Sequence, residues 1–184
     1  MENKKTNKFT FWDLVIFFTF YSVIGWCYEV FLEVLVYRWG FTNRGVLFGP
    51  YTPVYGFGAL AFLLLVYPVI RNKKGGKKLA FIPVVFLLCM LIATAIELGT
   101  SYILEALTGS WPWQTYADYA INFQARIALS PSVRFGLGGV LFLYVLQPLF
   151  EKICEKLGPK RVKTLAIVFL VIFAADCIYT FLLR

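Results

Sequence analysis

Five long apolar runs, separated by short polar or charged segments, dominate the hydrophobic pattern of this chain. They cover Phe9–Tyr37, Val54–Ile70, Leu79–Leu107, Phe135–Phe150 and Thr164–Leu183. A bilayer core about 30 Å thick is crossed by roughly 20 apolar helical residues. Each run is long enough to cross, with tilt in the longest and local bilayer thinning at the shortest. The pattern therefore predicts an all-α, polytopic membrane helix bundle with five transmembrane helices.

Composition leaves little room for anything outside the membrane. The chain has 184 residues, of which 60% are hydrophobic and only 15% are charged. A soluble domain of this size would not carry so many unbroken apolar runs. We therefore expect a single membrane domain over residues 1–184, in which 108–134 is the one long connection and forms an outer loop.

The distribution of positive charge predicts the orientation of the helices. The net charge is +8, and the basic residues gather in three clusters: before the first run, between the second and third, and between the fourth and fifth. Because lysine and arginine are retained on the cytoplasmic side, we expect the N-terminus on the cytoplasmic (inner) side of the membrane and the C-terminus outside. The basic residues do not line one soluble face, so nucleic acid is not an expected partner. The clusters are Lys4, Lys5 and Lys8; Arg71, Lys73, Lys74, Lys77 and Lys78; and Lys152, Lys156, Lys160, Arg161 and Lys163.

Glu29, Glu97 and Asp176 place carboxyl groups within the first, third and fifth apolar runs. An acid at the centre of a membrane helix costs about 2.5–3.5 kcal/mol, so it usually has a function. At 1.5 Å per residue, Glu29 lies about 26 Å beyond Trp12 and Glu97 about 27 Å beyond Leu79. Both acids should therefore reach the outer leaflet, and Asp176 should lie a little beyond the midplane. We expect an outward-facing polar pocket there.

Residues of the outer loops complete the candidate pocket. Arg126 is expected to lie near Glu29 or Glu97, and Arg44 to orient Glu29. The alternative is that these guanidinium groups pair with the carboxylates only to tie loops to helices. Glu33 and Glu105 are expected at the membrane interface. The candidate ligand-binding or gating residues are Glu29, Arg44, Tyr51, Tyr55, Glu97, Trp113, Asp118 and Arg126.

Residues 121–129 (INFQARIAL) alternate between apolar and mostly polar side chains, a period of two that predicts extended backbone. Extended backbone cannot face lipid, because its N–H and C=O groups would be unpaired. The segment should therefore lie against protein as an interfacial or re-entrant cap. The alternative is an aromatic-rich loop that only anchors the chain at the interface.

No motif points to a specific catalytic chemistry or cofactor. The sequence has no histidine, no GxSxG and no P-loop, so neither a metal site nor a nucleotide site is expected. The four cysteines are expected to be small buried hydrophobes. Two carboxyls could still serve as acid and base. An intramembrane enzyme acting on a lipid or envelope precursor through Glu29 or Glu97 is therefore one alternative, and a non-catalytic membrane scaffold is another.

Several short motifs resemble a known family when their order and spacing are taken together. The chain is similar to the bacterial family named putative ABC-transporter permease, type IV, over about residues 15–150. Ala125 stands where the family pattern would have glycine. The resemblance implies a permease-like transport component with a pocket for a small or amphiphilic ligand. Its expected partners are membrane lipid and either further copies of the chain or a separate ATPase subunit. The motifs are IGWCYE (24–29), NRG (43–45), FGPY (48–51), PVYGFG (53–58), ATAIE (93–97), DY (118–119) and NFQARI (122–127).

Overall fold

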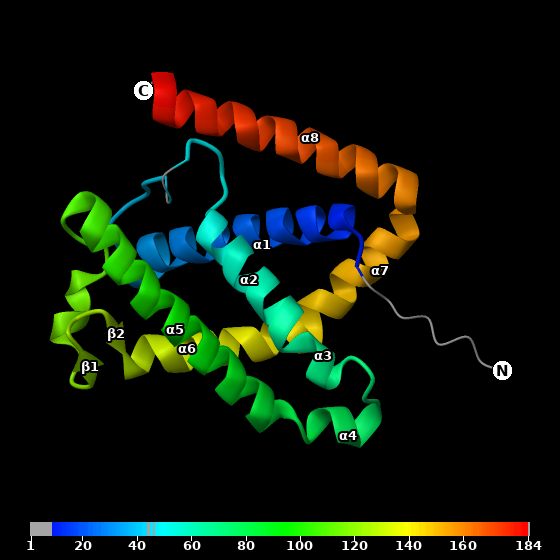
Figure 1. Ribbon diagram of the computed structural model, residues 1–184, viewed down its shortest axis with the longest axis horizontal. Coiled ribbons are helices and arrows are strands. Elements are labelled where there is room, and N and C mark those ends of the chain that lie inside the picture. The colour runs from blue at the N-terminus through cyan, green and yellow to red at the C-terminus, as the bar shows by residue number, and fades with distance from the viewer. Residues whose placement is uncertain (1–8, 44, 46, 184) are drawn as a thin grey trace. The chain divides into compact units, whose positions relative to one another are not determined.

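The computed structural model describes residues 9–43, 45 and 47–183, most of which are helical (Figure 1). Within this part of the chain, four helical segments are long and apolar enough to cross a membrane, and Pro53–Leu65 is a shorter apolar helix. The predicted all-α, polytopic helix bundle is confirmed. The fifth crossing and the orientation stay predictions. The four long segments are Phe11–Val36, Gly75–Leu107, Leu129–Leu157 and Pro159–Leu183.

The chain divides into two compact units, and we describe each by itself. The first comprises Met1–Leu60 together with Leu149–Arg184, and the second comprises Ala61–Pro148. The helix α2 (Pro53–Leu65) contributes residues to both. That the whole chain forms a single membrane domain stays a prediction.

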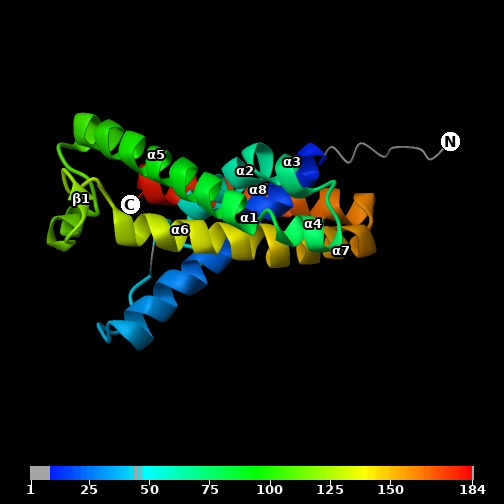
Figure 2. The same cartoon turned by 90° about the horizontal axis from the view of Figure 1, so that it is seen from below.

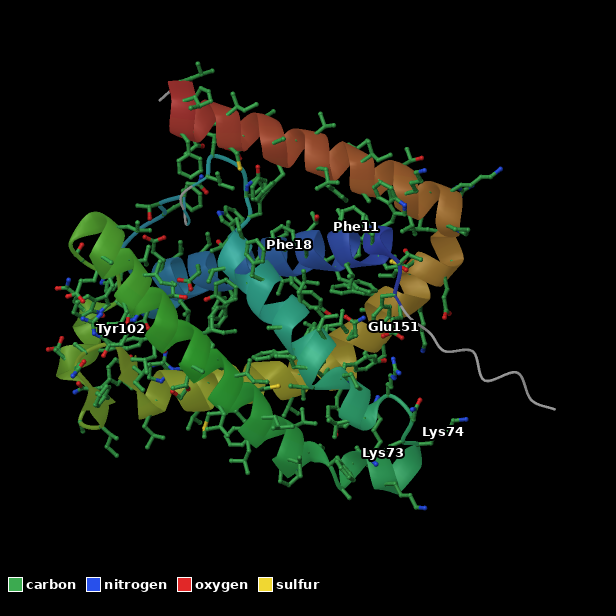
Figure 3. All side chains as sticks on the ribbon, viewed as in Figure 1. Phe11, Phe18, Lys73, Lys74, Tyr102 and Glu151 are labelled. Carbon is green, nitrogen blue, oxygen red and sulfur yellow. The ribbon has the colours of Figure 1, made fainter. Side chains whose placement is uncertain are left out.

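In the first unit, α1 (Phe11–Phe31) packs against α8 (Pro159–Ile178). Thr10 caps α1: its hydroxyl accepts the Asp13 N–H, and its own N–H donates to the Asp13 carboxylate. This reciprocal capping satisfies two N–H groups that the helix cannot pair internally. Phe18, labelled in Figure 3, lies with its ring centroid 4.9 Å from that of Phe57 on α2 and 5.7 Å from that of Phe173 on α8. Two π-helical turns extend these helices, η1 (Leu32–Val36) after α1 and η4 (Tyr179–Leu183) after α8.

In the second unit, α5 (Ile82–Thr108) packs along α6 (Leu129–Leu141), which continues through the π-helical turn η3 (Phe142–Leu146) (Figures 1 and 2). Glycine allows the close approach. A Cβ atom at Gly139 would lie 2.5 Å from the Cβ of Cys89, whereas one at Gly138 would meet nothing within 4 Å. Small residues let membrane helices approach closely, and only those that face the partner helix matter. Two short helices precede α5, namely α3 (Tyr67–Ile70) and α4 (Gly75–Leu79).

The sequence placed several helix ends wrongly. The fourth run was expected at 135–150, but the helical segment covers Leu129–Leu157, including α7 (Gln147–Leu157). The segment 151–163, expected as a loop, is mostly helical, because lysine and glutamate are good helix formers and do not end a helix. The break comes at Gly158, whose φ of +79° suits glycine. Pro159 then begins α8, as proline often begins a helix.

A short β-hairpin follows the C-terminal end of α5 and precedes α6 (Figure 1). Its strands are β1 (Asn122–Phe123) and β2 (Ile127–Ala128), which pair antiparallel. The extended backbone predicted over 121–129 is therefore confined to these two strands, because residues 124–126 form a turn and α6 begins at Leu129. A 3₁₀ turn, η2 (Gln114–Asp118), occupies the loop before the hairpin. Because β2 contacts both α5 and α6, the hairpin lies against protein.

Ala125 lies in the hairpin turn, at a position whose backbone conformation favours glycine. Gln124 and Ala125 have φ values of +53° and +54°, positive as at both central positions of a type I′ turn, and the Arg126 N–H donates to the Phe123 carbonyl at 2.9 Å. A side chain is strained in this left-handed region by roughly 1–2 kcal/mol.

We expect Ala125→Gly to raise the free energy of unfolding by about 0.5–1 kcal/mol, since part of the relieved strain is offset by the greater freedom of glycine in the unfolded chain. Thermal unfolding in detergent would measure it. Ala128→Gly is the matched control: Ala128 is extended (φ −144°) and buried, so glycine there should be destabilising. Equal destabilisation by both variants would contradict the proposed strain.

Candidate functional site

Arg126 forms the centre of a polar cluster where the hairpin meets the end of α5. Its guanidinium forms an ion pair with Glu105 and donates to the Ser101 hydroxyl at 3.3 Å. The carbon at the centre of the guanidinium also lies 4.1 Å from the ring centroid of Tyr102 and 4.0 Å from that of Trp111. Figure 3 shows side-chain nitrogen and oxygen atoms gathered around Tyr102 at this end of α5. Only 6% of Arg126 is exposed, so its charge is neutralised and stacked inside the protein.

Two tryptophans of the preceding loop hold the hairpin in place. The indole N–H of Trp111 donates to the Ala125 carbonyl at 3.0 Å, and that of Trp113 donates to the Arg126 carbonyl at 2.8 Å. These bonds satisfy turn carbonyls that the short strands leave unpaired. Trp113 was predicted to line a pocket, and in the structure it positions the backbone of Arg126.

Glu97 lies one helical turn before Ser101 on α5. One carboxylate oxygen accepts a hydrogen bond from the Tyr116 hydroxyl at 2.8 Å. The other, Oε2, is buried and has no hydrogen-bond partner among the described residues. Burial, together with the neighbouring Glu97 charge, raises the pKa of the Tyr116 hydroxyl above its ordinary value. Tyr116 is therefore a neutral donor, and the Glu97 carboxylate is only half satisfied.

Arg126 was expected to lie near Glu29 or Glu97, but the structure gives Glu105 as its ion-pair partner. Glu105, which was expected only at the membrane interface, is therefore part of the cluster. Glu97 and Glu105 lie on one face of α5, about 12 Å apart along the helix, so a single guanidinium cannot reach both. The spacing of Glu105 four residues after Ser101 was the available signal.

Other predicted residues of this region lie apart from the cluster. Asp118 is exposed at the end of η2. The next residue, Tyr119, accepts a hydrogen bond from the Arg134 guanidinium at 2.8 Å. The Nε of Arg126 is, like Glu97 Oε2, buried without a hydrogen-bond partner in the described part of the chain. The second unit thus holds one free acceptor and one free donor near the same face of α5.

In the first unit, the Glu29 carboxylate accepts a hydrogen bond from the Tyr55 hydroxyl. Gly25, one turn before Glu29 on α1, makes this contact possible, because the Tyr55 ring lies directly over it. A Cβ atom at Gly25 would overlap the ring. The expected Glu29 partner, Arg44, lies outside the described residues. The expectation that Glu29 and Glu97 belong to one outward-facing pocket concerns both units and stays a prediction.

Asp176 binds the loop that follows α1. Its carboxylate accepts the N–H groups of Phe48 at 2.9 Å and Gly49 at 2.7 Å, and also the Tyr51 hydroxyl. Thr180 donates a further bond at 3.0 Å. Burial, helped by the hydrogen bond to Asp176, raises the pKa of Tyr51 above its ordinary value. Asp176 was recognised as an intramembrane acid but left out of the candidate site, since its loop partners lie more than a hundred residues away in sequence.

A shallow cavity of about 320 Å³ adjoins Asp176. Apart from Asp176 itself, its lining is mostly apolar. Since the Asp176 oxygens already accept several hydrogen bonds, the cavity has little polar character to offer a ligand. The lining residues are Phe48, Gly49, Pro50, Tyr51, Ile172, Ala175, Asp176 and Tyr179.

The same loop is also tied to the end of α1. Glu33, expected at the interface, is only 3% exposed and accepts the hydroxyl of Thr42 at 2.6 Å and its N–H at 3.3 Å. The Trp26 indole donates to Asn43 at 2.8 Å.

The cysteines differ in burial, since Cys89 and Cys154 are buried as expected whereas Cys27 is exposed. Within the described residues, no group of acidic, cysteine or histidine side chains is arranged to hold a metal ion.

A family model described as putative ABC-transporter type IV matches residues 16–181. The chain belongs to this family. The match extends beyond residue 150, where the recognised motifs ended, and includes Asp176 and most of α8. No curated protein and no solved structure matches the chain. Family and helices together make this a multi-pass membrane protein of an ABC-transporter family.

Proposed function

We propose that the chain is the permease-like subunit of an ABC transporter in a bacterial cytoplasmic membrane, and that Glu97 contacts the transported ligand. One observation carries the proposal: Glu97 Oε2 is buried without a hydrogen-bond partner among the described residues. A polar atom taken out of water without a partner costs a few kcal/mol. A ligand that donates a hydrogen bond or brings a positive charge would remove that cost.

The neighbouring contacts restrict what the ligand can be. Arg126 is neutralised by Glu105, and the partner of Glu97, Tyr116, is uncharged. The site therefore keeps the negative charge of one carboxylate, which favours a cation or a strong donor such as an ammonium, guanidinium or hydroxyl group. The unpaired Nε of Arg126 offers a donor to the same ligand. A small or amphiphilic molecule with both kinds of polar group fits this chemistry.

Energy for transport would come from a separate ATPase subunit. The sequence contains no P-loop of its own, and phosphate binding in such ATPases depends on that motif. The family supports association with other transporter subunits. Homo-oligomerisation of the chain is compatible with the same arrangement.

The decisive variant is Glu97→Gln, studied in the full chain purified from its native membrane with its associated proteins. An ATPase subunit should co-purify, and the variant should retain it and unfold at a temperature no lower than the wild type. Loss of one hydrogen bond to a charged group should weaken ligand binding about 10- to 100-fold. The ATPase rate of the purified complex should fall correspondingly.

Glu155→Gln on α7 is the control, because Glu155 is an exposed acid and its replacement should leave the rate unchanged. A correctly folded Glu97→Gln protein with an unchanged ATPase rate would contradict the ligand role and favour the non-catalytic scaffold. If Glu97→Gln abolished the effect of the protein in cells while no ATPase co-purified with the wild-type chain, the result would contradict the transporter subunit and favour the intramembrane enzyme.

A further inference from the structure

A basic cavity lies at the corner between α7 and α8, in the first unit. Its volume is about 290 Å³, and it is lined by Leu157, Lys160, Arg161, Thr164 and Leu165. The corner exists because Gly158 turns the chain with φ +79° and Pro159 begins α8; Figure 1 shows the abrupt change of direction in orange. Two cationic side chains, one hydroxyl and two leucines thus surround one hollow.

Within the described residues, no acidic side chain forms an ion pair with the two cations of this cavity. Lys160 and Arg161 are both exposed, and neither forms an ion pair with another described residue. They lie in the first turn of α8, which contains no acidic residue. The N-terminus of a helix carries partial positive charge and disfavours cations. The local charge is therefore unfavourable by itself, and a bound anion would relieve it.

The surroundings favour an anion that is attached to acyl chains. Pro159–Leu183 is one of the apolar spans, so the cavity lies at the polar end of a membrane-crossing helix. Along α8, Val168, Val171 and Ile172 are 47%, 63% and 52% exposed and can contact lipid tails. Nearby, the Lys163 ammonium lies 5.3 Å from the Trp12 ring centroid, and tryptophan is enriched at the level of lipid headgroups.

We propose that the α7–α8 corner binds the phosphate headgroup of an anionic phospholipid, through Lys160 and Arg161, with its acyl chains lying along α8. Basic groups beside a membrane helix attract anionic lipids in proportion to their number. The site is separate from Glu97 and independent of the transported ligand. The Thr164 hydroxyl lines the cavity but adds no donor for the phosphate, since its hydrogen is already donated to the Lys160 carbonyl at 3.1 Å.

The test uses the purified full chain in detergent, titrated with phosphatidylglycerol, phosphatidylcholine or inorganic phosphate, with bound lipid counted by native mass spectrometry. Phosphatidylglycerol should bind in preference to phosphatidylcholine, whose headgroup has no net charge. The double variant Lys160→Gln/Arg161→Gln should bind phosphatidylglycerol about 30-fold more weakly, since each cation contributes roughly fivefold. The charge-preserving exchange Lys160→Arg/Arg161→Lys should retain binding within about threefold.

The matched control is Lys74→Gln/Lys77→Gln, which removes the same charge from exposed residues that do not line the cavity. It should retain the affinity for phosphatidylglycerol. An equal loss in both double variants would show a diffuse effect of net charge and overturn the site. Inorganic phosphate competing as strongly as the lipid would assign the corner to a free anion instead, and the absence of a phosphatidylglycerol preference would also overturn the proposal.

Discussion

Replacing Arg126 by alanine should lower the free energy of unfolding by about 3 kcal/mol, because it removes a buried ion-pair partner and two cation–π contacts at once. The Ser101 hydroxyl also loses its donor. The value lies at the low end for a broken buried pair, since Glu105 is 42% exposed and water partly screens its charge. Chemical or thermal unfolding in a fixed detergent would measure the loss. Lys77→Ala, in an exposed basic segment, should change stability by less than about 0.5 kcal/mol.

A double-mutant cycle distinguishes the two acids that Arg126 could have used. Glu105→Gln should recover part of the loss in Arg126→Ala, with a coupling of about 1 kcal/mol, whereas Glu97→Gln should be additive within roughly 0.5 kcal/mol. Arg126→Lys should recover little, because an ammonium cannot stack between two rings as a planar guanidinium does. Coupling to Glu97 instead of Glu105 would contradict the observed ion pair.

Gly56→Ala should destabilise the first unit by about 1–3 kcal/mol, the usual cost of adding atoms to a packed contact. A Cβ atom at Gly56 would lie 2.7 Å from the Phe18 carbonyl oxygen and would also overlap the Ser22 hydroxyl. The carbonyl belongs to the backbone of α1, so relief requires the two helices to move apart. The thermal unfolding temperature of the full chain would fall accordingly.

Gly58→Ala provides the internal control for the same helix. A Cβ atom there meets nothing within 4 Å, and alanine favours helix over glycine by up to about 1 kcal/mol. The variant should therefore be neutral or slightly more stable than the wild type. If Gly58→Ala were the more damaging of the two, the packing of α1 on α2 described above would be wrong.

The sequence predicted the helices well because about 20 successive apolar residues have few alternatives to a membrane helix. It also located Glu29 and Glu97 in apolar helices, and it predicted extended backbone in the segment that forms the strands β1 and β2, although not the turn between them. It could not tell Gly56 from Gly58, or Gly139 from Gly138, since which glycine faces a neighbour depends on how the helices cross. The end of α7 was missed because charged residues can continue a helix into water.

The partners of the acids were harder to predict than their positions. A search for opposite charge favours arginine, yet the described partners are tyrosines: Tyr55 for Glu29, Tyr116 for Glu97 and Tyr51 for Asp176. A phenol hydroxyl can satisfy a carboxylate without a charge of its own. Each pair joins residues far apart in sequence, so only the folded loops bring them together. The pairing of Arg126 with Glu105 was missed for the same reason, because the position of the hairpin determines which residues of α5 the guanidinium reaches.

The tyrosine–carboxylate contacts also determine which attachments can open cheaply. Breaking a hydrogen bond to a charged group costs about 1.5–3 kcal/mol, while breaking a buried ion pair costs about 3–5 kcal/mol. Moving a hydroxyl away from an acid separates no opposite charges, and water or a ligand can replace it. The turn carrying Tyr116 is therefore attached to Glu97 by a hydrogen bond that water or a ligand can replace, whereas the hairpin is attached to α5 by the ion pair of Arg126. In a transport cycle of the proposed kind, the turn carrying Tyr116 would move while the hairpin stays in place on α5.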